Sequence, residues 1–256
     1  MTRPDWRNAN DYRFTLQLNA GQWAWEFLRR NPEYQADWCW FSAAWKRLEA
    51  RYGKPPERNF QAWQRDPDAY RVVDDDTGDC RVDEDKVLIE CWMGSKWGFY
   101  KFPLDPATDQ PRIGDQLSWR PLPEEVSVVD ASDQLDSGEE VFRLALAFEL
   151  DLPLRPQLEV AQRFLQRRQA YLRKQGRMQM KTVAALSPGW TLMLQLLDAR
   201  QAGESLASMQ SALVGACAVD TGLADLLGQA VELVDGGYRA LSIIPEGKPV
   251  RANNRD

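Results

Sequence analysis

Basic side chains gather between residues 151 and 200, and their chemistry suits the binding of phosphates. This stretch holds nine Lys or Arg residues but only three Asp or Glu residues, and nothing acidic lies between Gln162 and Lys181. Such a run of cations can neutralise the phosphates of a nucleic acid. The whole chain carries a net charge of −6. Physiological salt screens charges over ~8 Å, however, so distant carboxylates need not cancel a local basic face. The run predicts either a polyanion partner or a solvated helix face.

A helix is expected over residues 157–175, and a helical wheel extended to Lys181 sorts these side chains onto two faces. Four apolar residues fall within about 60° of one another on a helical wheel: Leu158, Ala161, Leu165 and Leu172. The opposite face collects five cations: Arg163, Arg167, Lys174, Arg177 and Lys181. Two more, Arg168 and Arg173, flank the apolar stripe. Because a glycine inside a helix costs about 1 kcal/mol, the last two cations share the face only if the helix continues past Gly176.

Residues 190–234 have the outline of a helix-turn-helix-like unit. We expect helices over 190–201, 206–214 and 223–234, with a break at 187–189 and a short turn at 202–204. The third helix carries no Lys or Arg and three acidic residues nearby. It would repel phosphates and lacks the arginine that guanine readout favours. Either the second helix faces the groove with Ser208, Gln210 and Ser211 as its polar tips, or the unit only packs.

Aromatic residues dominate the N-terminus, where residues 1–63 hold seven of the eleven tryptophans. A first helix is expected over 22–30. Asn31 then caps a second helix that has Pro32 in its first position and ends at Gly53. Six residues at steps of 4, 3, 4, 3 and 4 share one face of it: Tyr34, Trp38, Phe41, Trp45, Leu48 and Tyr52. This aromatic face predicts a core or an oligomer interface, and stacking on nucleic-acid bases is the alternative.

The middle of the chain predicts an acidic linker followed by an antiparallel sheet. Residues 64–85 are expected to form the linker, in which acidic residues crowd together from Asp74 to Asp85. A calcium-binding loop is the alternative for this acidic run, but it needs glycine at the sixth position, and counting from Asp74 Gly78 is fifth, so a solvated acidic turn is favoured. Strands are expected over 86–93 and 96–102 around a Gly94-Ser95 type II′ turn, over 117–120 and 126–129, and over the alternating run 142–150. The fold class is therefore α+β, with aromatic-rich N-terminal helices, a middle antiparallel sheet and a C-terminal helical, helix-turn-helix-like domain.

Several function classes lack their sequence signals. The chain has no histidine and no GxxxxGK[ST], GxGxxG or GxSxG motif, so we expect neither an enzyme, nor a metal site, nor a cofactor. There is no apolar run of ~20 residues and no N-terminal signal pattern, which favours a cytoplasmic protein. The four cysteines form no CxxC pair and are too few for a disulfide scaffold, so we expect a reducing cytosol and thiols that mostly pack as small hydrophobic side chains.

Particular motifs resemble a known family. Asp11-Tyr12 and the run from Trp23 to Tyr34 (WAWEFLRRNPEY) resemble the N-terminal transcriptional regulator-like domain of proteobacterial activators. Other runs resemble their C-terminal DNA-binding domain: 148–154 (FELDLPL) with Gln157-Leu158, 197–200 (LDAR) with Ala202-Gly203, and 236–239 (GGYR). The pairing, over residues 10–245, is similar to the RovC-like transcription factors, which activate type VI secretion genes and have relatives in integrative conjugative elements.

This resemblance implies a transcription activator that binds double-stranded promoter DNA. It also implies a higher homo-oligomer such as a hexamer, and an activator would contact RNA polymerase. The implied domains are a regulator-like domain at 1–63, the linker at 64–85, the sheet at 86–151, the DNA-binding domain at 152–245 and a flexible tail at 246–256. Family members carry a basic last long helix, which this chain lacks. DNA contacts are therefore assigned to Arg163, Arg167, Arg168, Arg173, Lys174, Arg177, Lys181, Arg200, Ser208, Gln210 and Arg239. Arg239 could instead pack on the Gly236-Gly237 turn. The alternative function is a protein-interaction module, an anti-activator or regulatory subunit that docks through the aromatic face.

Overall fold

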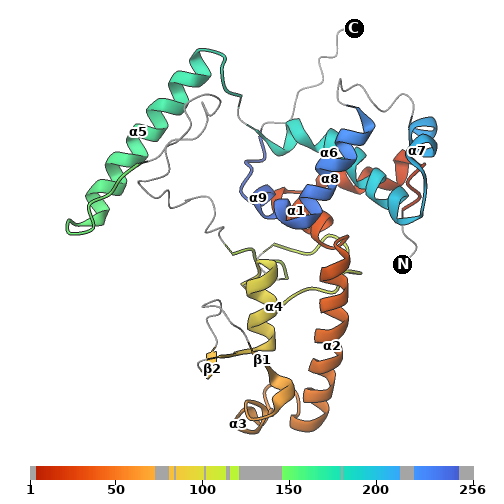
Figure 1. Ribbon diagram of the computed structural model, residues 1–256, viewed down its shortest axis with the longest axis vertical. Helices are drawn as coiled ribbons and strands as arrows, with labels where there is room; N and C mark the ends of the chain where they lie inside the picture. Colours follow the sequence, from red (N-terminus) through yellow and green to blue (C-terminus); the bar gives the residue numbers. More distant parts are fainter. Residues whose placement is uncertain are drawn as a thin grey trace. The chain divides into compact units, whose positions relative to one another are not determined.

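The computed structural model describes residues 4–72, 81–83, 85–100, 102–113, 116–120, 146–179, 181–213 and 222–247 (Figure 1). The chain divides into two compact units, one of residues 1–122 with 182–256 and one of residues 123–181. The acidic run at 74–79, the predicted strand at 126–129, the first half of the predicted strand at 142–150 and most of the tail lie outside the described residues. None of the helices in the described segments is long and apolar enough to cross a membrane.

The first unit begins with three helical segments, whose ends are set by local caps. They are the 3-10 helix η1 (Ala9–Gln17), α1 (Ala20–Leu28) and α2 (Pro32–Tyr52). Asn19 and Gln22 form a capping box at α1, and Asn31 accepts the N–H groups of Glu33 and Tyr34 at the start of α2. Gly53 follows α2 with φ of 83°, a conformation that glycine adopts without strain. The predicted start and end of the second helix are confirmed.

The N-terminal and C-terminal helices share one aromatic core. The helix α1 packs against α6 (Val183–Gln201) and α9 (Tyr238–Leu241), and the rings of Trp23 and Trp190 lie 5.2 Å apart. In the aromatic face of α2, Tyr34, Phe41 and Leu48 are fully buried, while Trp38, Trp45 and Tyr52 are partly buried against the same core. The periodic stripe is therefore occupied largely by packing within the chain.

The predicted hairpin at Gly94-Ser95 is wrong, because both residues lie inside the helix α4 (Ile89–Trp97). Ile89, Met93 and Trp97 are four residues apart and all buried, so a helical period decides the segment. The antiparallel sheet lies just before α4 and has the order β1-β3-β2, formed by β1 (Tyr70–Val72), β2 (Arg81–Asp83) and β3 (Lys86–Leu88). In its register, Arg71 of β1 faces Val87 of β3.

Other expectations for the middle of the chain also change. Residues 64–85 are more than a linker, since η2 (Pro67–Ala69) and two strands lie there, directly after α3 (Phe60–Trp63). The segment 117–120 forms isolated bridges, not a strand. Residues 146–150 are also not a strand; Leu150 is 86% exposed, so no buried face forms. The cysteines are not all packed thiols, because Cys39 is an exposed free thiol and Cys91 is in a disulfide bond.

The C-terminal part of the first unit is helical, as expected. It contains α6, α7 (Leu206–Ala212), α8 (Leu223–Glu232), the π-helical turn η4 (Leu233–Gly237) and α9, and α8 packs on α6 and α7. The predicted break at 187–189 is wrong. The Thr182 side chain caps an earlier start of α6, and the helix runs through Pro188.

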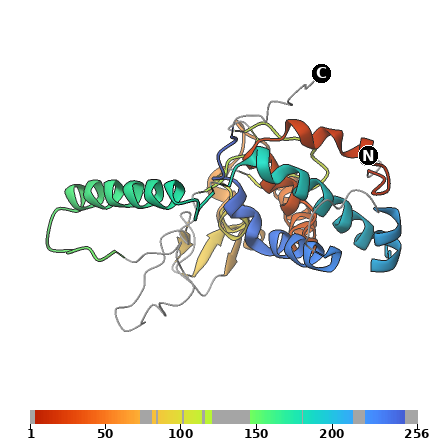
Figure 2. The ribbon, with the colours of Figure 1, turned by 90° about the horizontal axis from the view of Figure 1, so that it is seen from above.

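In the second unit the described residues form one long helix, α5 (Leu154–Lys174), seen from another direction in Figure 2. The Gln157 side chain exchanges two hydrogen bonds of 2.9 Å with the backbone of Glu149, so the preceding turn folds back on the start of α5. The helix ends before Gly176, whose φ is 67°. Arg177 and Lys181 therefore lie beyond α5 and do not extend its face.

Candidate functional sites

The exposed cations of α5 form the first candidate site. Arg163, Arg167 and Lys174 lie on one face of the helix and are exposed. Over the eleven residues from Arg163 to Lys174 this face is ~16 Å long. Arg168 and Arg173 are also exposed but lie beside the apolar stripe, and Arg177 and Lys181 are exposed after the helix. We call Arg163, Arg167 and Lys174 the basic face.

These side chains have few competing partners. The Nε atoms of Arg163 and Arg173 donate to main-chain oxygens one turn earlier, at 3.2 and 3.4 Å, and the Arg168 guanidinium lies 5.7 Å from the centre of the Tyr171 ring. Among the described residues, the ion pair that involves α5 joins Arg155 to Glu159 of the same helix, at 3.4 Å. In the segments that the structure describes, no carboxylate therefore pairs with the basic face.

The four remaining predicted DNA contacts lie in the first unit. Arg200 and Gln210 are exposed. Ser208 donates to Glu204 at 2.8 Å, and Glu204 also pairs with Arg7. Arg239 donates from Nη2 to the main-chain oxygens of Lys96 and Ser95, at 2.6 and 3.3 Å.

Two of these four side chains thus already have structural partners. Arg239 caps the C-terminal end of α4, where a guanidinium satisfies free carbonyls. The sequence had suggested a structural role for Arg239 as the alternative to DNA contact, but on the Gly236-Gly237 turn and not on α4. On α8 and the turn after it, Asp225, Glu232 and Asp235 are all exposed, in keeping with the predicted acidic character of this segment. Phosphate contact by α8 would be opposed by these charges.

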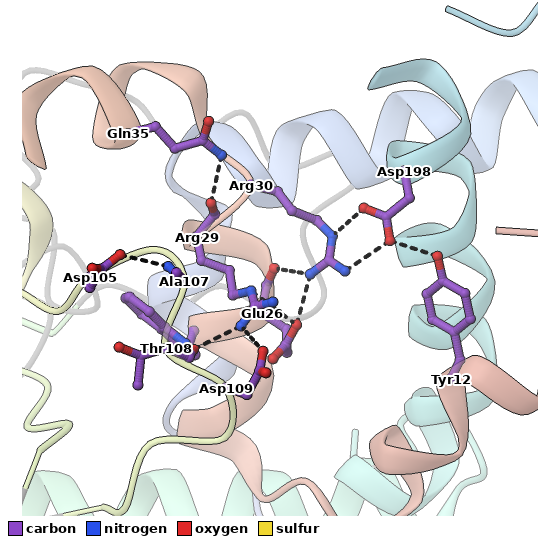
Figure 3. Close-up of polar contacts among 11 residues, drawn as sticks. Tyr12, Glu26, Arg29, Arg30, Gln35, Asp105, Ala107, Thr108, Asp109 and Asp198 are labelled. Carbon is purple, nitrogen blue, oxygen red and sulfur yellow. Dashed lines mark hydrogen bonds and ion pairs between the residues drawn. The ribbon is translucent and has the colours of Figure 1, made fainter. Parts of the chain in front are cut away.

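A second candidate site, which sequence reasoning missed, is a buried charge network in the first unit (Figure 3). Arg30, just after α1, donates from Nε and Nη2 to the two carboxylate oxygens of Asp198 on α6, both at 2.9 Å. Its Nη1 donates to the Glu26 carboxylate at 2.8 Å, and Tyr12 of η1 donates its hydroxyl to Asp198 at 2.6 Å. The network links η1, α1 and α6.

Burial makes the network energetically important. The side chains of Arg30, Glu26 and Asp198 are only 9%, 1% and 7% exposed. Burial alone would lower the pKa of Arg30, but the carboxylates of Asp198 and Glu26 outweigh it, so the pKa is raised and the arginine stays charged. Burial, reinforced by the charge of Asp198, raises the pKa of Tyr12. The one sequence signal for this network was Asp198 itself, an acid in an otherwise apolar stretch of helix.

The network forms one wall of a cleft of about 580 Å³. Its other walls come from η1, α2 and the loop 105–110. In that loop Asp109 accepts a hydrogen bond of 2.7 Å from Arg29, and Asp105 accepts the N–H of Ala107 at 2.8 Å. Figure 3 shows Arg29 turned toward this loop and Arg30 toward Asp198. The cleft volume is within the range of small-molecule sites, ~300–1,000 Å³.

Comparison with known proteins adds one finding. Residues 5–60 match the family model of the proteobacterial transcriptional regulator-like domain, which covers η1, α1 and α2. No curated protein and no solved structure gives a significant match. The match agrees with the predicted resemblance of the N-terminus but extends neither to the C-terminal helices nor to the RovC-like family. The match to this domain supports a role of the protein in transcription regulation.

Proposed function

We propose that this protein is a cytoplasmic, DNA-binding transcription activator that acts as a homo-oligomer and holds promoter DNA through the basic face of α5. The observation that carries the proposal is the set of exposed cations on that helix, which pair with no carboxylate in the described part of the chain. The regulator-like match at residues 5–60 supports the regulatory part. The resemblance to RovC-like factors suggests a hexamer, contact with RNA polymerase, and target genes of type VI secretion or mobile elements.

The geometry sets the strength of a single site. Three cations over ~16 Å can meet about three phosphates, because each DNA strand offers one per ~3.4 Å. The logarithm of the binding constant should then fall with the logarithm of salt concentration at a slope of about −3 per engaged protomer. Such contacts supply affinity without choosing a sequence. An oligomer would combine several weak sites into tight binding.

Base reading is assigned to α7, not to α8. Gln210 and Ser211 are exposed on α7, and amide and hydroxyl groups can bond base edges in the major groove. Arg200, exposed near the end of α6, would add a phosphate contact. The acidic residues of α8 argue against its entry into a groove.

The test is a titration of the full chain with a promoter fragment at several salt concentrations. The variant R163E/R167E/K174E should lose binding. The control R13E/K46E/R65E changes the net charge equally, at three exposed cations of the first unit, and should bind within about threefold of the parent, since screening limits the reach of distant charges. A flat salt response, or equal losses in both variants, would refute the assignment. Light scattering after size exclusion, with and without duplex DNA, reports the oligomer.

The alternative, a protein-interaction module docking through the aromatic face of α2, finds less support. Tyr34 and Phe41 are buried in the core of their own unit, so they offer no surface to a partner. Co-purification of a stoichiometric protein partner without DNA retention at low salt would favour this alternative over the DNA-binding activator.

A further inference from the structure

The cleft of the first unit has an unbalanced charge. Five carboxylates line it, from Asp11, Glu26, Asp105, Asp109 and Asp198, against two guanidinium groups, from Arg29 and Arg30. Both arginines are already committed to carboxylates, Arg30 to Glu26 and Asp198 and Arg29 to Asp109. An incoming anion would have to displace these partners.

Two of the carboxylates pair with no cation among the residues that the structure describes. Asp105 accepts the backbone N–H of Ala107 at 2.8 Å, and Asp11 accepts the N–H of Asp5 at 2.9 Å and the side-chain amide of Asn8 at 2.7 Å. These donors are neutral, so the negative charge remains. Because the carboxylates outnumber the guanidinium groups, the cleft has a net negative charge, which attracts cations.

The remaining walls suit an organic cation better than a metal ion. Phe14 of η1 and Trp38 of α2 line the cleft and are partly buried against the core. Aromatic faces next to carboxylates are the usual surroundings of a bound ammonium or guanidinium group. The carboxylates are distributed around the cleft, and no group of three or more potential metal ligands forms among the described residues.

We propose that this cleft binds a small organic cation, with a primary ammonium or guanidinium group near Asp105 and an apolar body against Phe14 and Trp38. The ligand would contact the regulator-like domain, the loop 105–110 and α6 together, because all three line the cleft. The site does not depend on DNA binding and can be tested without DNA.

The probe is phenethylammonium, titrated into the full chain by calorimetry. Phenylacetate serves as the anion of similar size and 2-phenylethanol as the neutral analogue. We expect one ammonium bound per chain, roughly tenfold more tightly than the neutral analogue because the aromatic and carboxylate contacts act on the charge, and phenylacetate weakest. Equal binding of all three compounds, or no binding of the ammonium, would overturn the proposal.

Two further measurements place the probe in the cleft. Asp105→Asn keeps the oxygen that accepts from Ala107 but removes the charge, and should weaken the ammonium severalfold; the matched control Asp225→Asn, on α8 outside the cleft, should leave it unchanged. Cys39 is an exposed free thiol on the cleft wall, so its alkylation, followed by peptide mass spectrometry, should slow when the ammonium is bound. An unchanged alkylation rate at saturating probe, or an equal effect of both substitutions, would count against the site.

Discussion

Replacing Arg30 by methionine should destabilise the first unit by about 3 kcal/mol. The substitution keeps much of the side-chain volume but removes the charge that holds Asp198 and Glu26. Removing one partner of a buried ion pair costs about 3–5 kcal/mol, because the other charge stays buried without a counterion. The lower end applies here: Asp198 keeps its hydrogen bond from Tyr12 at 2.6 Å, and Glu26 keeps Arg29 at 3.6 Å.

A double-mutant cycle separates the ion pair from packing. Asp198→Leu should also destabilise the first unit strongly, since the buried Arg30 guanidinium loses the carboxylate that accepts two of its hydrogen bonds. The double variant R30M/D198L should be less destabilised than the sum of the single changes, with a coupling of about 2 kcal/mol, because no charge between these two residues is left unpaired. Urea unfolding followed by tryptophan fluorescence gives the free energies by linear extrapolation.

The control is the exposed pair of α5. Arg155 and Glu159 are 91% and 60% exposed, and Arg155→Met should change the stability by less than about 0.5 kcal/mol, since water already solvates both groups. The reasoning is refuted if Arg30→Met costs under about 1 kcal/mol, or if the two single changes add without coupling. Either result would mean that the network does not fasten α1 to α6.

Three other perturbations follow from the same structure. Burial raises the pKa of Tyr12, Tyr34 and Tyr238, so the folded chain keeps protons that the unfolded chain loses above pH ~10. The free energy of unfolding should therefore stay constant up to pH ~10 and fall above it by up to about 1.4 kcal/mol per pH unit per tyrosine. Urea unfolding midpoints measured at a series of alkaline pH values check this, and midpoints that do not change between pH 9.5 and 11 would contradict it. Burial also raises the pKa of Glu90, whose Oε2 is buried and has no hydrogen-bond partner among the described residues. Ionisation of Glu90 therefore opposes folding at neutral pH, and Glu90→Gln should raise the melting temperature, with the gain disappearing below pH ~4. Gly98 ends α4 at φ of 80°, and a Cβ there would lie 3.0 Å from Nε of Arg239; Gly98→Ala should lower stability by about 1–2 kcal/mol, and an unchanged thermal midpoint would contradict the role of this turn.

Helix caps were predictable because their cause is local. Asn31 with Pro32 fixed the start of α2, and Gly53 fixed its end. Each signal depends on the chain within four residues of itself. The amphipathic pattern of α5 was predictable as well, because it follows from the spacing of residues within the helix. Gly176 was predicted as a possible end of the helix, and α5 ends two residues before it.

The hairpin failed because two periods compete in a short segment. Between residues 86 and 102 the Gly94-Ser95 pair satisfies a turn pattern, while Ile89, Met93 and Trp97 satisfy a helical one. Long-range packing decides between them. Trp97 lies 5.3 Å from the Tyr34 ring of α2, a contact across more than sixty residues. Local preference gives way when tertiary contacts bury several large side chains at once.

The charge network was beyond sequence reasoning for a related reason. Arg30 and Asp198 are 168 positions apart, and a single sequence holds no record of which acid meets which base. The motif around Asp198 resembles part of a DNA-binding domain, and nothing in that resemblance predicts that the carboxylate anchors α6 to the N-terminal helices.

The buried charges of the network and the exposed charges of the basic face should affect different properties of the protein, namely stability and DNA binding. Arg30, the cation of the first-unit network, is buried and paired with two carboxylates. The cations of the basic face are exposed and have no such partner among the described residues. Charge reversal of Arg163, Arg167 and Lys174 should therefore abolish DNA retention while leaving the unfolding midpoint unchanged. Arg30→Met should lower the midpoint while the remaining folded protein retains DNA at full salt sensitivity. If both variants lost both properties together, charge on this chain would serve folding alone, and the basic face would have no separate function.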